Sequence, residues 1–221
     1  MAKTKITVKI VASLLQAFDK QLDELHIKRD AFFNSMLLGE IPNLERDLKG
    51  KRLSAQAKRH IASALKRLGT KQVNVSIDHA TAKALNAVVT KTNIVRDAFV
   101  NRLIMFLRSS DVVLKYLELP QFVNSSSFEG HVEPMPTSPL KAIEAVHSDP
   151  LYYLRVAAEE RFGSGLYLID LPVSYTGLAC FLEDSQIIGT KEWERAQKET
   201  HRLIQELEAL EAEAFRKVKG K

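Results

Sequence analysis

One stretch of this chain occurs twice, and this repeat restricts what the chain can fold into. Residues 5–37 align without a gap with residues 72–104 when one copy is shifted by 67 positions. Because one register holds through three successive patterns, we interpret the match as an internal repeat of one structural unit. The identical pairs are Val8 with Val75, Ile10 with Ile77, Ala17 with Ala84, Ile27 with Ile94, Arg29 with Arg96, Asp30 with Asp97, Ala31 with Ala98, Phe32 with Phe99 and Asn34 with Asn101.

Each copy predicts a strand followed by two helices. In residues 5–10, β-branched residues alternate with polar ones, which is typical of a half-buried strand. Residues 14–25 and 85–92 then carry apolar residues at spacings of three and four, as amphipathic helices do. A break follows at His26 or Asn93, and asparagine tolerates a left-handed backbone there. The next helix opens with Arg-Asp-Ala-Phe in both copies, and its early aspartate suits the helix dipole.

This order of strand, helix, turn and helix resembles the ribbon-helix-helix family of bacterial, phage and plasmid DNA-binding proteins. In that family two units pair their strands into one antiparallel ribbon that enters the major groove. A single unit has an unpaired strand and a small core, so a pair is the smallest stable object. Because both copies lie in one chain, the resemblance implies a covalent pseudo-dimer, as in the tandem ribbon-helix-helix accessory proteins of conjugative plasmids. We therefore expect residues 1–110 to be mainly α-helical with a short two-stranded antiparallel ribbon, built from copies at 5–39 and 72–107.

The resemblance assigns DNA reading to the outer face of the ribbon. Lysine can donate to guanine, asparagine and glutamine can pair with adenine, and threonine or serine suits either base. The expected base contacts are Lys5, Thr7 and Lys9 from copy one and Gln72, Asn74 and Ser76 from copy two. The two sets differ, so we expect one half-site for each strand and a site that need not be palindromic. The alternative is an ordinary solvated strand face.

The resemblance also implies phosphate contacts at the start of each second helix, where backbone N–H groups can point at an anion. These positions are Lys28 and Arg29 in copy one and Val95 and Arg96 in copy two. Family members often have a small hydroxyl residue at the cap, where this chain has Lys28 and Val95. The repeated Arg-Asp pair has a second reading, as a structural ion pair. The side chains expected at phosphates are those of Lys28, Arg29 and Arg96.

A basic connector, residues 44–70, joins the two copies. Residues 46–71 hold nine Lys or Arg and a single acidic residue. A helix is predicted from an N-cap at Ser54 to a stop at Gly69, and the run Gly39–Asn43 is predicted to end copy one in a turn. Two roles stay open for the connector: a solvated tether, or a clamp on the phosphate backbone beside the ribbon. The clamp residues would be Arg52, Lys58 and Arg59.

Charge divides the chain into a basic and an acidic half. Residues 1–110 contain 20 Lys or Arg and 9 Asp or Glu, a net charge of +11. Residues 111–221 contain 12 and 18, a net charge of −6. This asymmetry is expected when a nucleic-acid module is joined to a regulatory or assembly module.

The second half is predicted to contain a linker and an α+β domain. Residues 111–139 include a polar, irregular stretch with four prolines and predict a linker. In residues 140–221 a helix is expected to start at Asp149–Pro150 and end at Gly163. Residues 166–169 predict a buried strand, and residues 176–188 do not decide between strand and helix.

A long helix over residues 190–218 closes the chain. Its apolar residues form a heptad-like seam among Glu, Lys and Arg, from Trp193 to Ala214. The helix can pack on its own domain or form a coiled coil between chains, and the sequence leaves both open.

The chain offers little for catalysis. Cys180 lies in an apolar run, as a core residue does, and a single cysteine excludes an intramolecular disulfide and fits a reducing cytoplasm. The six histidines show no metal-ligand spacing, and residues 163–165 read as a helix stop rather than a phosphate loop. We expect no enzyme, no metal and no cofactor. Without a membrane-length apolar run or a signal-type N-terminus, a cytoplasmic, nucleoid-associated protein is expected.

These patterns together predict sequence-specific binding of double-stranded DNA, most directly by a transcriptional repressor. One alternative is an accessory factor of plasmid transfer or partition, which binds DNA to place other proteins on it. Another is an antitoxin whose acidic C-terminal half binds a protein partner. A homodimer formed through the C-terminal half is also open.

The repeat makes a prediction about strand pairing. The connector of about 30 residues is long enough to span one small module, and the entropic cost of closing such a loop rises only slowly with its length. The copies should therefore pair within one chain rather than between chains. A fragment of residues 1–110 is expected to be a folded monomer by sedimentation at micromolar concentration. An obligate dimer would contradict pairing within the chain.

Overall fold

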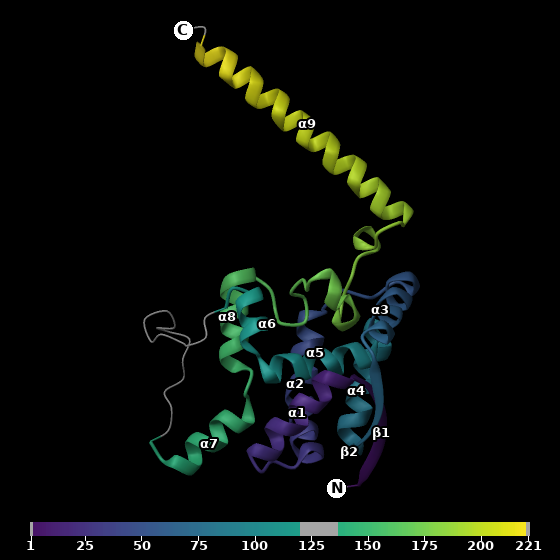
Figure 1. Cartoon of the computed structure of the whole chain (residues 1–221), viewed down its shortest axis with the longest axis vertical. Coiled ribbons are helices and arrows are strands. Elements are labelled where there is room, and N and C mark those ends of the chain that lie inside the picture. Colours follow the sequence, from purple (N-terminus) through teal and green to yellow (C-terminus); the bar gives the residue numbers. More distant parts are fainter. Residues whose placement is uncertain (1, 120–136, 220–221) are drawn as a thin grey trace.

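The computed structural model describes residues 2–119 and 137–219, except for the side chains of residues 209 and 211–219. The described residues are mainly helical, with one two-stranded antiparallel sheet (Figure 1). In chain order the elements are β1 (Lys3–Val11), α1 (Ala12–Glu24), α2 (Arg29–Asp47), α3 (Ala55–Arg67), β2 (Thr70–Asp78), α4 (His79–Thr92), α5 (Arg96–Arg108), α6 (Asp111–Tyr116), α7 (Pro139–Ser148), α8 (Tyr152–Phe162), the 3-10 helices η2 (Val173–Leu178) and η3 (Asp184–Gln186), and α9 (Lys191–Lys219).

The sheet is a ribbon made by the two repeat copies. β1 pairs with β2 of the same chain in antiparallel register, which confirms the predicted pairing of these strands within the chain. One face of the ribbon is apolar and turned inward, as the alternation predicts. Its fully buried side chains are Val8, Ile10, Val75 and Ile77.

The helices of the two copies cross over beneath the ribbon. α2, from copy one, packs against β2 and α4 of copy two. α5, from copy two, packs against β1 and α1 of copy one. Each copy therefore completes the core of the other, which explains why one copy alone has too little core to be stable.

Both predicted breaks are present, and Asn93 adopts the left-handed conformation expected of asparagine. His26 and Asn93 have φ angles of 55° and 58°, so both breaks between helices are left-handed. Ser54 Oγ accepts a hydrogen bond of 2.9 Å from the backbone N–H of Ala57 and caps α3. Gly69, with φ at 72°, follows α3 in a conformation that suits glycine. The predicted connector helix is confirmed.

Copy one does not end in a turn at Gly39–Asn43, and that prediction is wrong. α2 continues through this run to Asp47. Pro42 has no N–H and therefore removes one hydrogen bond from the helix. The helix persists because its apolar face continues, with Ile41, Leu44 and Leu48 all buried while Pro42 faces solvent.

The second half contains helices and turns, and its described residues form no strand. The strand predicted at residues 166–169, and with it the α+β character, is wrong because these residues form a buried turn. The fully buried guanidinium of Arg102 donates to the carbonyl of Leu166 at 2.9 Å and to that of Ile169 at 2.6 Å. These carbonyls are thus satisfied without a partner strand.

Three other predictions for this half can be compared with the structure. Residues 176–188, which periodicity did not resolve, contain the end of η2 and all of η3. α8 ends at Gly163 as predicted but begins at Tyr152 rather than at Asp149–Pro150. In the predicted linker, α6 and the first residue of α7 are helical, and residues 120–136 lie outside the described residues.

A buried ion pair joins α2 to the C-terminal half. The Glu40 carboxylate accepts hydrogen bonds from Arg155 Nη1 at 2.8 Å and from Tyr167 Oη at 2.6 Å. Burial works to lower the pKa of Arg155, but Glu40 and Asp149 raise it above its ordinary value. Burial, reinforced by Glu40, raises the pKa of Tyr167 well above its ordinary value. Arg155 therefore stays charged and Tyr167 stays a hydrogen-bond donor at neutral pH.

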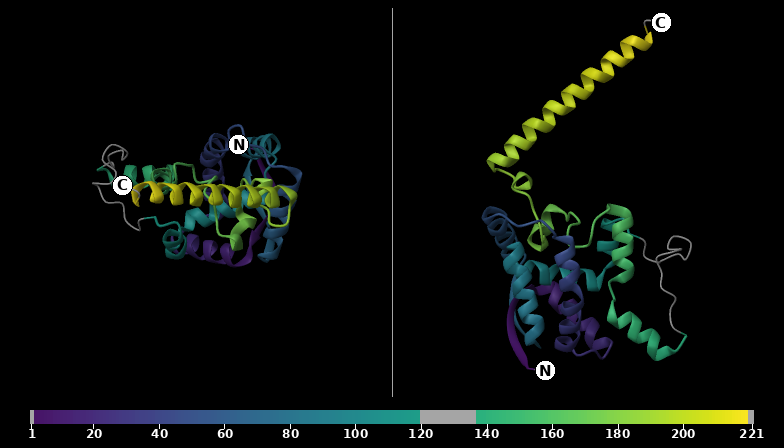
Figure 2. Two further views of the ribbon diagram at one scale, coloured as in Figure 1. Left: turned by 90° about the horizontal axis from the view of Figure 1, so that it is seen from above. Right: turned by 180° about the vertical axis from the view of Figure 1, so that it is seen from behind.

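The long helix α9 extends away from the rest of the molecule (Figures 1 and 2). Near its start, Trp193 and Ala196 are half-buried. Further along, the seam residues Leu203, Leu207 and Leu210 are 49%, 62% and 62% exposed. The seam described up to Leu210 therefore does not pack on the chain's own body, and a coiled coil between chains stays a prediction.

Close contact between η2 and α3 provides a stability test. A Cβ atom at Gly177 would lie 2.5 Å from the backbone nitrogen of Leu65. We expect Gly177→Ala to lower the free energy of unfolding by about 1–3 kcal/mol, the usual effect of overpacking, as measured by urea denaturation. The control is Gly39→Ala inside α2, where no atom lies within 4 Å of the added Cβ. That change should raise the free energy by about 0.5–1 kcal/mol. Equal stability of the two variants would contradict the contact.

Candidate nucleic-acid interface

The outer face of the ribbon carries all six residues predicted to contact bases. Alternation along β1 and β2 turns their polar side chains away from the core. Ser76 is half-buried, and the other five are exposed: Lys5, Thr7, Lys9, Gln72 and Asn74. At the middle of this face, Thr7 Oγ1 donates to Asn74 Oδ1 at 2.9 Å. The structure thus brings the six side chains together on one accessible surface.

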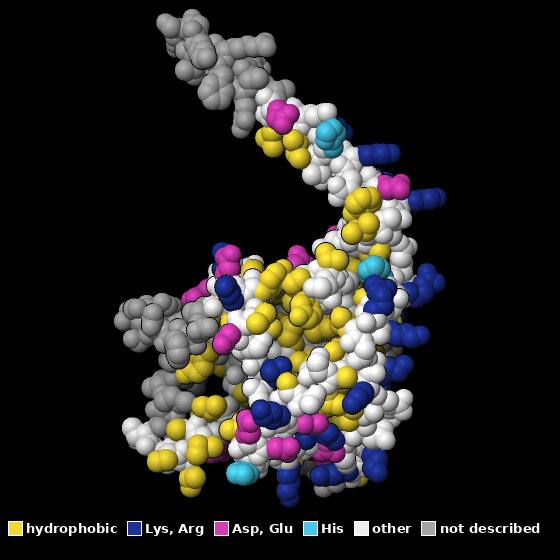
Figure 3. All heavy atoms as spheres, viewed as in Figure 1, with side chains coloured by type: hydrophobic (Ala, Val, Ile, Leu, Met, Phe, Trp, Pro, Cys, Tyr) yellow, Lys and Arg dark blue, Asp and Glu magenta, His cyan; other side chains and the backbone are white. Residues whose placement is uncertain are grey.

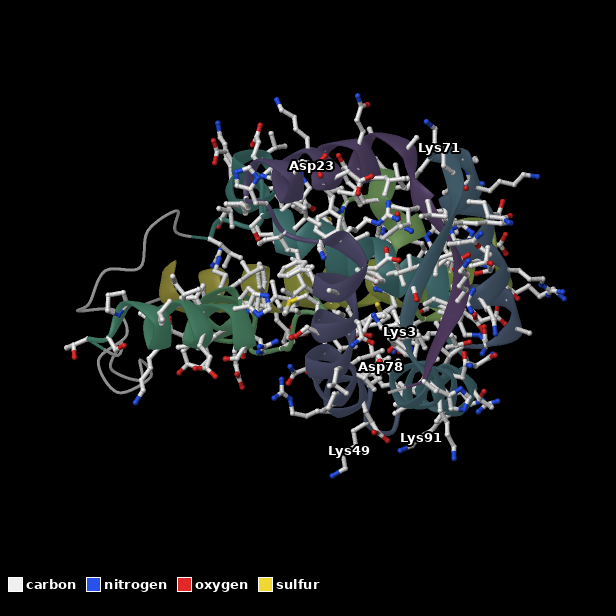
Figure 4. The ribbon with its side chains drawn as sticks, turned by 90° about the horizontal axis from the view of Figure 1, so that it is seen from below. Lys3, Asp23, Lys49, Lys71, Asp78 and Lys91 are labelled. Atoms are coloured by element: carbon white, nitrogen blue, oxygen red, sulfur yellow. The ribbon has the colours of Figure 1, made fainter. Side chains whose placement is uncertain are left out.

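The strand register centres the ribbon on a repeat-related pair. Thr7 lies opposite Asn74, which is its own equivalent in copy two. A local two-fold axis therefore passes through this pair, and each end of the ribbon combines residues from both strands. Figure 4 shows Lys3 and Asp78 at one end and Lys71 at the other.

This register divides the predicted base contacts differently from the sequence-based expectation of one half-site for each strand. Lys5 lies opposite Ser76, toward one end, and Lys9 lies opposite Gln72, toward the other. The two lysines of β1 therefore belong to opposite halves of the ribbon. We call the first the Lys5 end and the second the Lys9 end.

Two repeat-related asparagines hold the strands to the second helices. Asn101 of α5 accepts from the backbone N–H of Val11 and donates to the carbonyl of Lys9, both at 2.8 Å. Asn34 of α2 accepts from the backbone N–H of Asp78 at 2.8 Å and donates to the Asp78 carboxylate at 3.0 Å. Each asparagine thus binds the strand of the other copy. The repeat contained these residues, but their role depends on the pairing and was not predicted.

The arginines predicted to contact phosphate are held by acidic residues. Arg29 lies 3.2 Å from Asp30 and 3.5 Å from Asp19, and Arg96 lies 3.6 Å from Asp97. Arg96 also donates to the carbonyl of Thr7 in β1. Both arginine side chains are about one-third exposed. The structure therefore supports the ion-pair reading of the repeated Arg-Asp motif.

The caps of the second helices leave backbone donors available at the ribbon's sides. Lys28 and Val95 occupy the N-cap positions of α2 and α5, and neither side chain caps its helix. Lys28 is exposed. The first N–H groups of a helix have no partner within it, so both ends could receive an anion.

Two of the three predicted clamp residues have structural partners. Arg52 donates to the carbonyl of Lys91 at 2.8 Å, at the end of α4. Lys58 donates to Asn93 Oδ1 at 2.9 Å and steadies the turn before α5. Arg59 is exposed and has no hydrogen bond or ion pair within the described ranges.

A hollow beside the Lys9 end reveals a basic residue that the sequence reasoning missed. The hollow has a volume of about 560 Å³ and lies between the end of α3, the ribbon and the start of α5. Lys66 of α3 lines it together with Lys9 and Gln72. Lys66 lies in the last turn of α3, shortly before β2. Because a helix stop was predicted at Gly69, the sequence could have placed Lys66 beside the start of this strand.

Cys180 and the possible metal ligands were the other candidates for chemistry in the described residues. Burial raises the pKa of the Cys180 thiol to about 12, so it stays protonated at neutral pH and behaves as a core residue. Within residues 2–119 and 137–219, no cluster of three His, Cys, Asp or Glu could hold a metal ion. None of the helices searched there is long and apolar enough to cross a membrane.

Comparison of the chain with protein-family models, with curated proteins and with solved structures finds no match. The assignment of this surface as a nucleic-acid interface therefore depends on the sequence and the geometry of this chain.

The asparagine contacts predict unequal losses of stability. Asn101 is fully buried, whereas Asn34 is half-buried. We expect Asn101→Ala to lower the free energy of unfolding by about 1–3 kcal/mol, because two partly buried backbone groups of β1 lose their partner, and Asn34→Ala to lower it by less. Urea denaturation measures both. Asn86→Ala on the exposed face of α4 is the control, with an expected change within about 0.5 kcal/mol. A loss at Asn86 as large as that at Asn101 would contradict the assignment.

Proposed function

We propose that residues 1–110 form a tandem ribbon-helix-helix module and that the protein binds double-stranded DNA by placing the ribbon in the major groove. The single observation that carries the proposal is the ribbon register. It pairs Thr7 with Asn74 on a local two-fold axis and presents six polar side chains on one outer face. The crossed helices and the asparagine contacts support it, since they hold together the paired strands that the resemblance implies.

The size and chemistry of the outer face suit the groove. A two-stranded ribbon fits the major groove, which is about 12 Å wide. Lys5 and Lys9 can donate to the acceptors of guanine, and Gln72 and Asn74 can pair with adenine. The backbone of the ribbon is held by α2 and α5, so the face is rigid before DNA arrives. Rigidity lowers the ordering cost of binding.

The charge distribution favours a polyanionic partner. Residues 1–110 carry a net charge of +11, from 20 basic and 9 acidic residues. Figure 3 shows Lys and Arg side chains along the edge of the molecule where α3 and the ribbon lie. Contacts between such residues and phosphates supply sequence-independent affinity and make it depend on salt.

Repression is the most direct consequence of such binding, because a protein seated on a promoter excludes polymerase. The exposed apolar seam on α9 favours a second role, as an accessory factor of plasmid transfer or partition that places another protein on the DNA. Transcription assays on the chain's own promoter distinguish the two. A repressor lowers the transcript level there, whereas an accessory factor has its site elsewhere.

Removing the β1 side chains from the outer face tests the proposal. The full-length chain first selects its site from randomised duplexes. The triple variant Lys5→Ala, Thr7→Ala, Lys9→Ala should then lose specific affinity, at about 1–3 kcal/mol for each base contact. It should keep its circular dichroism melt, because these side chains are exposed.

A charge-matched control separates base reading from loss of charge. Lys115→Ala with Lys198→Ala also removes two positive charges, from exposed positions on α6 and α9. This control should retain the preference for the selected site. Full specific affinity in the triple variant, with an unaltered melt, would rule out the ribbon as the reading element.

A further inference from the structure

The two ends of the ribbon are not equivalent, although the two-fold axis relates their backbones. In a ribbon made from two identical chains, both ends would present the same side chains. Here the Lys5 end presents Lys5 opposite Ser76, and the Lys9 end presents Gln72 opposite Lys9. The two-fold axis would place Lys5 on Gln72 and Lys9 on Ser76. If the protein is turned around on the same DNA, Gln72 takes the place of Lys5 at one end and Ser76 takes the place of Lys9 at the other.

The connector helix increases this difference, because α3 occurs only once. It leads into β2 through Gly69, whose carbonyl accepts a hydrogen bond of 3.0 Å from the backbone N–H of Ala12. α3 therefore ends at the Lys9 end and has no counterpart at the Lys5 end. Residues 48–77 contain eight Lys or Arg and no Asp or Glu.

One face of α3 continues the basic surface beyond the Lys9 end. Arg59 and Lys66 are seven positions apart, so they lie on the same face two turns apart, and both are exposed. Lys66 borders the hollow that also contains Lys9, which places this face next to the ribbon. In Figure 3, Lys and Arg side chains lie along the edge of the molecule where α3 and the ribbon lie.

Among the described residues the Lys5 end has no such helix, and it carries a carboxylate, Asp78, whose repeat equivalent is Val11. Asp78 lies opposite Lys3 there and is bound by Asn34. Asp30 also lies at this end, where it accepts a hydrogen bond of 3.0 Å from the backbone N–H of Ser76 and pairs with Arg29. Its repeat equivalent Asp97 lines the hollow at the Lys9 end, so the two ends are distinguished by Asp78 and by α3.

We propose that the protein binds a non-palindromic duplex site in one orientation, with the Arg59–Lys66 face of α3 on the DNA backbone beyond the Lys9 end. This inference rests on the proposed function. The protein then covers a longer stretch on the Lys9 side than on the Lys5 side. The reversed orientation mismatches both ends and removes α3 from its flank, so it should be disfavoured by at least tenfold, roughly the effect of one misplaced base contact.

Directed cleavage from the two ends of the ribbon tests the orientation. Ala2→Cys places an iron chelate at the Lys5 end, and Ser63→Cys places one on the exposed face of α3. The chain's own Cys180 is fully buried, so chelate-treated wild type is the blank. On the site selected from randomised duplexes, each variant should cut one flank, and the two flanks should be opposite. Equal cutting of both flanks by each variant would overturn the single orientation. Failure to select any site would instead overturn the proposed function.

Shortened duplexes test the role of α3 without labels. Removing the flank on the Lys9 side should weaken wild-type binding at low salt by on the order of tenfold, whereas removing the other flank should change little. Arg59→Gln with Lys66→Gln should abolish this difference and reduce the salt slope by about 2, because two phosphate contacts are lost. The control Lys115→Gln with Arg195→Gln should behave as wild type. Equal losses from the two truncations would show that α3 does not touch DNA.

Discussion

Each strand of the ribbon has its only strand partner in the other one, since β1 and β2 together form the whole sheet of the described residues. An isolated strand would leave a row of N–H and C=O groups unpaired beside an apolar face, so neither copy of the repeat can fold alone. Pairing brings Thr7 opposite Asn74 and makes the two copies related by a local axis. The positions of the four flanking helices then follow, because each second helix is bound to the strand of the other copy through Asn34 or Asn101.

The two halves of a covalent pair can carry different side chains, whereas those of a dimer of identical chains cannot. The connector between the copies had to span the module, and in this chain it does so as a capped helix rather than a loose loop. Because α3 and the two outer strand faces occur once each, the molecule keeps a two-fold backbone with unlike ends. An internal repeat can therefore support recognition of an asymmetric partner, which a symmetric dimer of the same unit would not favour.

The second half of the chain completes the core and adds buried hydrogen bonds and an ion pair whose loss would destabilise the fold. Arg102 is fully buried, and burial lowers its pKa from the ordinary value. Its hydrogen bonds go to the Leu166 and Ile169 carbonyls and not to a carboxylate. Glu40 depends in turn on Arg155 and Tyr167. Removing residues 149–170 would leave both buried charges without these partners, a large penalty in a medium of low polarity. The N-terminal module and the C-terminal half are therefore linked energetically, which counts against the expectation that residues 1–110 fold without the second half.

The sequence predicted well where the signal was local or repeated. Alternation in β1 and β2, the cap at Ser54, the breaks at His26 and Asn93 and the strand pairing were all readable, because each depends on short-range chemistry or on the repeat. The predicted turn at Gly39–Asn43 was wrong because an apolar face buried by distant residues outweighed a proline and a glycine.

By itself, then, the sequence determined the repeat, its strand faces and the polar residues on them, since side-chain alternation follows from the backbone of a strand. Only the tertiary structure decided how those residues are shared between the two ends. The register assigned Lys5 and Lys9 to opposite halves, and contacts between distant segments occupied Arg96, Arg52 and Lys58 while leaving Arg59 and Lys66 exposed. Partners of a charged side chain depend on which elements meet, and no local pattern records that.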